Sequence, residues 1–429
     1  MVRSIWRQAL RLCHSSAWWS DVWRFVRDYG VCFLPIVLLG YITFESYQID
    51  FRSMYLAGKS VVLGLDPYVN YVGVRADFYG PINSESNAYS GFRYPPLAAI
   101  AFVPLGMLPY ESAKLWFTVA MLAAVVLLIS HFVKASGFSV PESAVLFIMF
   151  SFPVIAAVER GQVDAVIVCF SVFSYSLTVR QSSSRSSSGA AFLLAIAGML
   201  KLFPFFLLIF YGVRRQWRFV GTTLAYAAVL FALPYPFLVR SSYGNFFRRS
   251  LPEHFGQIAT GLPTDLQGQG VIDRMVHSVD STNLLAAHSL SSGGMNPWMM
   301  DNTLGAVICG LVLSGLLFVA MHRTPLDFQF YAFLNTINLF NPVSWIMGLI
   351  WYVPLFLYLS RFVSRLGLFL LLAPLFSPPL LGANAVLAYV IAIVFALSFR
   401  MRSWGSLFYL SERLNPPVSN QSALATPTR

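Results

Sequence analysis

The sequence predicts an all-α protein that crosses a membrane many times. Of its 429 residues, 57% are hydrophobic and only 11% are charged, and the mean hydropathy is +0.65. A soluble protein of this length carries roughly a quarter charged residues. Apolar runs recur along almost the whole chain, which is typical of a polytopic helical bundle. We therefore expect about ten to twelve transmembrane or half-depth helices and no separate soluble domain.

The basic balance of the chain, with a formal net charge of +11, fits helix orientation better than nucleic-acid binding. Its arginines form short clusters between apolar runs: Arg3, Arg7 and Arg11; Arg214, Arg215 and Arg218; Arg361 and Arg365; Arg400 and Arg402. Clusters of this kind follow the positive-inside rule and form no basic groove.

The cysteines give no sign of a disulfide framework or a metal site. They lie in the amino-terminal tail or within apolar runs, at Cys13, Cys32, Cys169 and Cys309. Neither metal-ligand spacing nor pairing in a polar loop is present. The sequence also has no phosphate loop, no Gly-x-Gly-x-x-Gly after a strand and no Asp-x-Asp pair. We therefore expect no metal and no cofactor.

Three regions follow from the order of apolar and polar segments. Residues 1–30 are expected to be a cytoplasmic, interfacial amphipathic segment rather than a cleaved signal. Residues 31–402 form one membrane domain, and residues 403–429 form a cytoplasmic tail that is partly disordered. Within the membrane domain, two sizeable polar segments, 48–94 and 240–302, are expected on the external face.

The apolar runs differ in whether they can span a bilayer, which takes about 20 residues in a helix. The full-length candidates are approximately 31–47, 114–133, 142–158, 163–180, 218–239, 303–321, 326–340, 343–360, 366–381 and 383–399. Two more runs are irregular: Tyr94 to Pro109 is short and rich in proline, and Ala190 to Val213 is interrupted by Lys201 and Pro204. Broken helices are tolerated at membrane depth only where they line a cavity.

Two topologies fit these runs. If every run crosses the bilayer, Arg180 and Arg185 lie outside and Gln162 and Asp164 lie inside. If the two irregular runs are re-entrant or half-depth hairpins, the loop arginines are cytoplasmic, which satisfies the charge rule better. The second topology, which we favour, also brings the polar residues of interest to the external face: Asp50, Tyr94, Gln162, Asp164 and Lys201.

Asp50 is the first of these residues, because it follows the first apolar run directly. A carboxylate where hydrocarbon meets water is costly and suggests a function. It could also simply end a helix. Three further features are the segment Phe92 to Leu97, the polar turn Arg160 to Asp164, and the lone lysine of Lys201 to Pro204.

Together with Asp50 and with Asn341 to Trp345, these features resemble glycosyltransferase family 87, in chain order from about Ile49 to Trp345. The resemblance implies the GT-C fold and a hexosyltransferase of the plasma (inner) membrane that uses a polyprenyl-phosphate sugar, with mannose as the expected sugar. Its acceptor would be a glycolipid or glycan at the external face. The lack of a phosphate loop, of Gly-x-Gly-x-x-Gly and of an Asp-x-Asp pair likewise favours a lipid-linked rather than a nucleotide-linked sugar donor. The amino terminus would be cytoplasmic.

The resemblance also implies roles for particular residues. The general base falls on Asp50, with Asp66 as the weaker candidate. Because a polyprenyl phosphate is a good leaving group, one base and one cationic phosphate site suffice for displacement with inversion. Lys201 is the best phosphate ligand, since a lysine inside an apolar run is expensive unless it is paired, although it could also snorkel or form a salt bridge.

Further residues are candidates for substrate binding beside Asp50 and Lys201. Arg93, Arg160 and Arg274 are alternative phosphate ligands, and Tyr94 lines the expected site. Gln162 and Asp164 could bind sugar hydroxyls or cap a helix. Ser344 and Trp345 begin a helix where an aromatic face suits a sugar ring, but the histidine that often follows this pair in the family is replaced by Ile346, Met347 and Gly348. The loop histidines His254, His277 and His288 are possible substitutes.

Two other classes of function are alternatives to a glycosyltransferase. A lipid-glycan transporter predicts an internal repeat and charges in several helices, and neither is evident. An O-antigen-type polymerase or ligase depends on external-loop arginines, a role for which Arg248, Arg249 and Arg274 are available.

Overall fold

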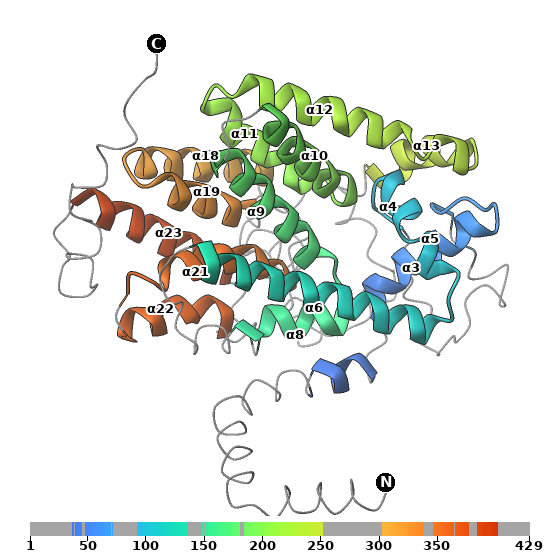
Figure 1. The fold of residues 1–429 in the computed structure, drawn as a ribbon, viewed down its shortest axis with the longest axis horizontal. Coiled ribbons are helices and arrows are strands. Elements are labelled where there is room, and N and C mark those ends of the chain that lie inside the picture. Colours follow the sequence, from blue (N-terminus) through green and yellow to red (C-terminus); the bar gives the residue numbers. More distant parts are fainter. Residues whose placement is uncertain are drawn as a thin grey trace, which may run out of the picture.

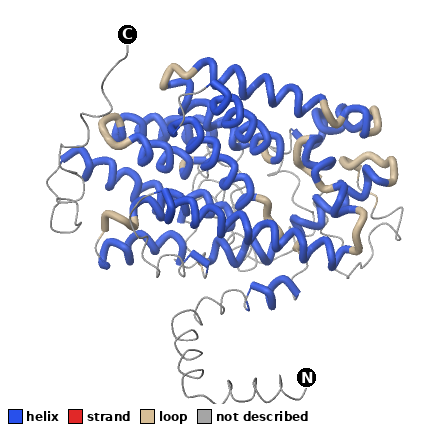
Figure 2. Tube along the Cα trace, viewed as in Figure 1, coloured by secondary structure: helices blue, strands red, loops and turns tan. Residues whose placement is uncertain are grey.

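The computed structural model describes residues 48–69, 92–135, 151–180, 184–251, 303–337, 346–363, 365–376 and 384–401, with short pieces at 37, 39–44, 71 and 148–149. Within these ranges every regular element is a helix (Figures 1 and 2). The expectation of an all-α protein is therefore confirmed. The predictions for residues 1–30, 252–302, 338–345 and 403–429 concern residues outside the described part of the chain.

Four helices build one end of the body, the right-hand end of Figure 1. They are α3 (Ile49–Val62), α4 (Pro96–Ala101), α5 (Val103–Gly106) and the first turns of α6 (Tyr110–Ala135). The short run from Tyr94 to Pro109 is broken between α4 and α5, as its prolines predict. Helix α3 was not expected, because its sequence was assigned to a polar external segment.

Two glycines let α3 pack directly against the α4–α5 backbone. A Cβ atom at Gly58 would overlap the carbonyl group of Phe102, and one at Gly106 would overlap the backbone of Lys59. The hydroxyl of Tyr55 also donates to the carbonyl oxygen of Leu108 at 2.8 Å. These contacts fix the middle and the last turns of α3 relative to α4 and α5.

A group of helices in the middle of the chain follows. It comprises α8 (Phe152–Arg160), α9 (Asp164–Arg180), α10 (Ser184–Leu200), η3 (Phe203–Phe206), α11 (Leu207–Val213), α12 (Trp217–Ala232) and η4 (Tyr235–Phe237). The run from Ala190 to Val213 is interrupted at Lys201, as predicted, because α10 ends at Leu200 and a 3-10 turn begins at Phe203. Helix α12 ends beside α13 (Ser241–Asn245), and the turn η5 (Phe246–Ser250) follows.

The carboxyl-terminal helices complete the body. They are α18 (Thr303–Met321), α19 (Leu326–Asn335), η8 (Ile346–Tyr352), α21 (Val353–Leu359), α22 (Arg365–Phe376) and α23 (Asn384–Met401). The run 343–360 was expected to be one helix, but its described part is a 3-10 segment followed by α21, which has a proline in its first turn. Proline is tolerated there because the first helical N–H groups need no intrahelical partner.

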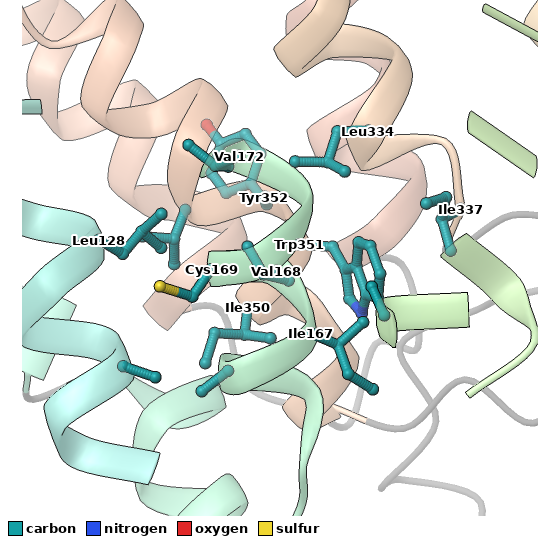
Figure 3. Packing of buried hydrophobic residues seen from close by; sticks show 14 of the residues in the cluster. Leu128, Ile167, Val168, Cys169, Val172, Leu334, Ile337, Ile350, Trp351 and Tyr352 are labelled. Atoms are coloured by element: carbon teal, nitrogen blue, oxygen red, sulfur yellow. The ribbon is translucent and has the colours of Figure 1, made fainter. Parts of the chain in front are cut away.

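Helix α9 lies at the centre of the core. Its buried Ile167, Val168 and Val172 pack with Leu334 of α19 and with Trp351 of η8, as Figure 3 shows. Burial of such side chains is the main source of stability for the bundle away from lipid. The amino-terminal end of α9 is thereby held against η8.

Among the described residues, two helical stretches are long and apolar enough to cross a membrane, Tyr110–Phe132 and Trp217–Phe237. Seven shorter apolar helices accompany them: Asp164–Val179, Ser187–Leu200, Phe203–Val213, Leu311–Met321, Gly348–Leu359, Leu366–Phe376 and Leu387–Phe399. The expected ten to twelve crossing or half-depth helices, and the topology, stay predictions.

Candidate active site

The first turn of α3 carries Asp50, and a glutamine from a distant part of the chain binds it. The Nε2 atom of Gln162 donates to Oδ2 of Asp50 at 2.5 Å. Gln48, two residues before Asp50, has a left-handed backbone conformation (φ 49°) and donates from Nε2 to the carbonyl oxygen of Val158 at 2.8 Å. A left-handed non-glycine residue is uncommon and typical of constrained sites. The Asp50 side chain is thus held by Gln162, and the chain just before it is held at Gln48.

The polar turn between α8 and α9 fits against α3 because of one glycine. Gly161 ends α8 in the left-handed region (φ 71°), and a Cβ atom there would overlap the Cβ atom of Phe51. Glycine is the residue that adopts this conformation without strain. The turn can therefore bring Gln162 to Asp50 and start α9 at Asp164.

Asp164, which is buried, and Lys201, which is partly buried, form an ion pair. The Nζ atom of Lys201 lies 2.8 Å from Oδ2 and 3.0 Å from Oδ1 of Asp164. The indole N–H of Trp351 donates to the same Oδ1 at 3.2 Å. Lys201 is available for this pair because α10 ends one residue before it. Asp164 also lies in the first turn of α9, where the helix dipole favours a negative charge.

Tyr94 lies close to both carboxylates. The side chain is buried, and the charges of Asp50 and Asp164 raise its pKa, after burial itself, which has the largest effect. Arg93 opposes this rise in pKa. The segment before α4 therefore meets the turn between α8 and α9 at one point.

The electrostatic environment of Asp50 favours its protonated form. Burial raises the pKa of its carboxyl group, and the neighbouring charge of Asp164 adds to the rise. Arg160, the hydrogen bond from Gln162, and Lys201 act in the opposite direction, Arg160 most strongly. A carboxylate with a raised pKa near cations is a suitable proton acceptor for a weakly acidic hydroxyl.

Comparison with protein families now adds to this geometry. The sequence model of glycosyltransferase family 87 matches residues 92–342, more than half of the 429-residue chain. The chain belongs to glycosyltransferase family 87. No curated protein matches it.

The family 87 match covers part of the cluster. Tyr94, Arg160, Gln162, Asp164 and Lys201 lie inside the matched range. Asp50 and Trp351 lie outside it and join the cluster through the hydrogen bonds to Gln162 and Asp164. The case for Asp50 thus rests on its contacts with residues of the matched range.

Asp66, the second candidate for the base in this family 87 chain, lies in a different group of contacts. Its Oδ2 accepts hydrogen bonds from Ser241 at 2.7 Å and Asn245 at 2.8 Å, and its Oδ1 accepts one from the backbone N–H of Tyr68 at 3.0 Å. The side chain is buried. Three donors bind the Asp66 carboxylate, whereas a general base needs an oxygen free to accept a proton. The contacts of Asp66 are therefore those of a structural residue.

Several predicted residues cannot be placed. Arg274, Ser344 and Trp345 lie outside the described residues, as do His254, His277 and His288. Within the described part of the chain, no three His, Cys, Asp or Glu side chains come together as a metal site would require.

Sequence reasoning missed two members of the cluster, Gln48 and Trp351. It named the neighbouring Trp345 instead. A signal for Trp351 was available, because an indole N–H inside an apolar helix needs a hydrogen-bond partner and Asp164 is a buried acceptor. Nothing in the sequence distinguished Gln48 from any other polar residue at the end of an apolar run.

Proposed function

We propose that this family 87 glycosyltransferase moves a sugar, with mannose as the first candidate, from a polyprenyl phosphate to a hydroxyl group of a glycolipid or glycan at the external membrane face. The observation that carries the proposal is one cluster of contacts around the turn between α8 and α9. Gln162 donates a hydrogen bond to Asp50, and Asp164, two residues after Gln162, forms an ion pair with Lys201. A base and a cation are the two groups that such a displacement requires.

The proposed reaction is a direct displacement. The acceptor hydroxyl gives its proton to the Asp50 carboxylate as its oxygen attacks the anomeric carbon of the sugar. The bond from that carbon to the phosphate oxygen breaks, and the electron pair leaves with the polyprenyl phosphate. Attack opposite the leaving group inverts the anomeric configuration.

Lys201 is proposed to stabilise the negative charge on the departing phosphate. In the structure its ammonium group is held by Asp164, and the Lys201 side chain is only 14% exposed. Electrostatic stabilisation is strongest in a site from which water is excluded. Arg160 and Arg93 are further candidates for phosphate contact, and Tyr94 and Gln162 for contact with the sugar or the acceptor.

The carboxyl group of Asp50 provides the main test. Purified protein in lipid nanodiscs is incubated with polyprenyl-phosphate mannose and a membrane glycolipid extract, and sugar transfer is followed by radiolabel. Asp50→Asn keeps an acceptor for Gln162 but no base, so we expect transfer to fall by at least about 10²-fold while donor binding persists.

Glu111→Gln is the matched control, because it makes the same chemical change at the start of α6, where the side chain is 64% exposed. It should leave transfer unchanged. Substantial turnover by Asp50→Asn would refute the assignment of the base. Parallel reactions with polyprenyl-phosphate arabinose decide which sugar is used.

A further inference from the structure

We infer that Asp66 is a positioning residue, which joins the two external segments and sets the place of Tyr94 beside Asp50. This inference rests on the proposed function. The polar cluster that carries it consists of Asp66, Tyr68, Ser241 and Asn245, hereafter the Asp66 cluster.

The Asp66 cluster is more than a local turn. An aspartate often accepts a hydrogen bond from the backbone two residues ahead, and Oδ1 of Asp66 does so with Tyr68. Its other oxygen, Oδ2, accepts two hydrogen bonds from α13. The donors are Ser241 and Asn245, which follow Asp66 by 175 and 179 residues in the chain. Ser241 and Asn245 are four residues apart and so share one face of α13.

Tyr68 continues the connection from Asp66 towards the active site. Its hydroxyl donates to the carbonyl oxygen of Tyr94 at 2.9 Å. Its ring centroid lies 5.3 Å from that of Phe92 and 5.7 Å from that of Phe246, which directly follows α13. Phe92 in turn lies 5.7 Å from Tyr94. Polar and aromatic contacts therefore run together from α13 to Tyr94.

This connection matters because Tyr94 lies beside the proposed base. Its own neighbours Asp50 and Asp164 are fixed by other helices, whereas the backbone of Tyr94 precedes α4 and is held by Tyr68. Loss of the Asp66 cluster should therefore shift Tyr94 relative to Asp50 without altering the hydrogen bond between Gln162 and Asp50. An effect on acceptor binding, rather than on proton transfer, is the expected result.

A reciprocal exchange of side chains tests the link. Asn245→Asp puts two carboxylates in contact, and we expect the acceptor KM to rise about tenfold with kcat nearly unchanged. In the double variant Asp66→Asn with Asn245→Asp, the new amide donates to the new carboxylate, so KM should return to within about threefold of the original value. Asp66→Asn alone should be mild, because the Asn245 amide can turn to accept.

Hydrogen exchange provides a readout that needs no substrate. Asn245→Asp should raise the exchange of the amides in α13 and also in residues 94–98, and the double variant should reverse both changes. Tyr68→Phe removes only the bond to Tyr94, so it should raise KM and the exchange of 94–98 while α13 stays protected.

The outcomes separate this inference from the proposed function. If the unmodified protein transfers no sugar from any polyprenyl-phosphate donor, the proposed function fails and the exchange pattern alone decides the role of Asp66. If Asn245→Asp loosens α13 but leaves 94–98 and KM unchanged, or if the double variant restores neither, Asp66 is not a positioning residue.

Discussion

The Asp50 carboxylate carries its charge in surroundings that favour the neutral acid. Because burial raises its pKa in the folded protein above that of the unfolded chain, the protonated form stabilises the fold. That contribution is present below the ordinary aspartate pKa and is lost as the pH rises through the raised value. At neutral pH the ionised side chain therefore costs stability, as expected of a group kept for chemistry.

Asp50→Asn should thus raise the melting temperature at neutral pH although it lowers sugar transfer. The amide is neutral at every pH, so the difference from the unmodified protein should shrink towards about pH 4. Thermal unfolding in detergent at several pH values measures it. A melting temperature that is unchanged or lower at neutral pH would contradict the assigned environment.

The pH dependence of transfer tests the same group. A base must be ionised, so transfer should fall as the pH drops through the raised pKa of Asp50, above the range of an ordinary aspartate. The profile of kcat/KM reports this value for the free enzyme. An acidic limb at the ordinary aspartate pKa would mean that another group is the base.

Trp351 contributes through one N–H group. Trp351→Phe keeps an aromatic ring in the core but removes one of the donors to Asp164. We expect a loss of about 1 kcal/mol in stability and a donor KM several-fold higher, because the Lys201–Asp164 pair loses part of its support. Trp217→Phe, at a position that is 65% exposed, is the matched control and should change neither quantity.

At the scale of elements, the turn between α8 and α9 carries the residues that contact both Asp50 and Lys201. Gly161→Ala adds a Cβ atom that overlaps Phe51 and forces a non-glycine residue to φ 71°. Gly64→Ala has a similar φ, 65°, but no atom within 4 Å of the new Cβ. Comparing the two variants separates backbone strain from packing.

We expect Gly64→Ala to cost about 1 kcal/mol and to leave transfer intact. Gly161→Ala should cost at least about 2 kcal/mol more and abolish transfer, since Gln162 can no longer reach Asp50. Melting temperatures and transfer rates measure both. Equal effects from the two variants would show that the close contact with Phe51 does not matter.

The elements also show how far sequence reasoning reaches. The break at Lys201 was predictable because a lysine and a proline interrupt an apolar run, and the start of α9 at Asp164 was predictable from a polar turn between apolar segments. Helix α3 was not, because its apolar residues face neighbouring helices rather than lipid. Its glycines are informative only once the partner helix is known.

The convergence of site residues could be inferred only in part. Placing Asp50, Tyr94, Gln162, Asp164 and Lys201 at one end followed from a topology chosen by the charge rule, and in the structure hydrogen bonds or electrostatic interactions link all five. Which carboxylate meets the lysine did not follow from the sequence. Pairing depends on side-chain directions that only tertiary packing determines.

At the scale of the whole molecule, the orientation in the membrane can be measured. In a cysteine-free background, Leu63→Cys just after α3, in the segment 48–94 expected on the external face, and Arg323→Cys after α18 introduce thiols at two exposed positions. A membrane-impermeant maleimide should label the first in intact cells and the second only after permeabilisation. The reverse pattern would place the active site on the cytoplasmic face and exclude the proposed topology.

The glycine contacts between α3 and the α4–α5 pair have a mechanical consequence. Where backbone meets backbone at Gly58 and Gly106, no side chain lies between the helices that could change rotamer. The three helices must then move as one rigid body during any conformational change. Asp50, in the first turn of α3, would travel with this body, whereas Tyr94 lies before α4 and its position is set separately by Tyr68.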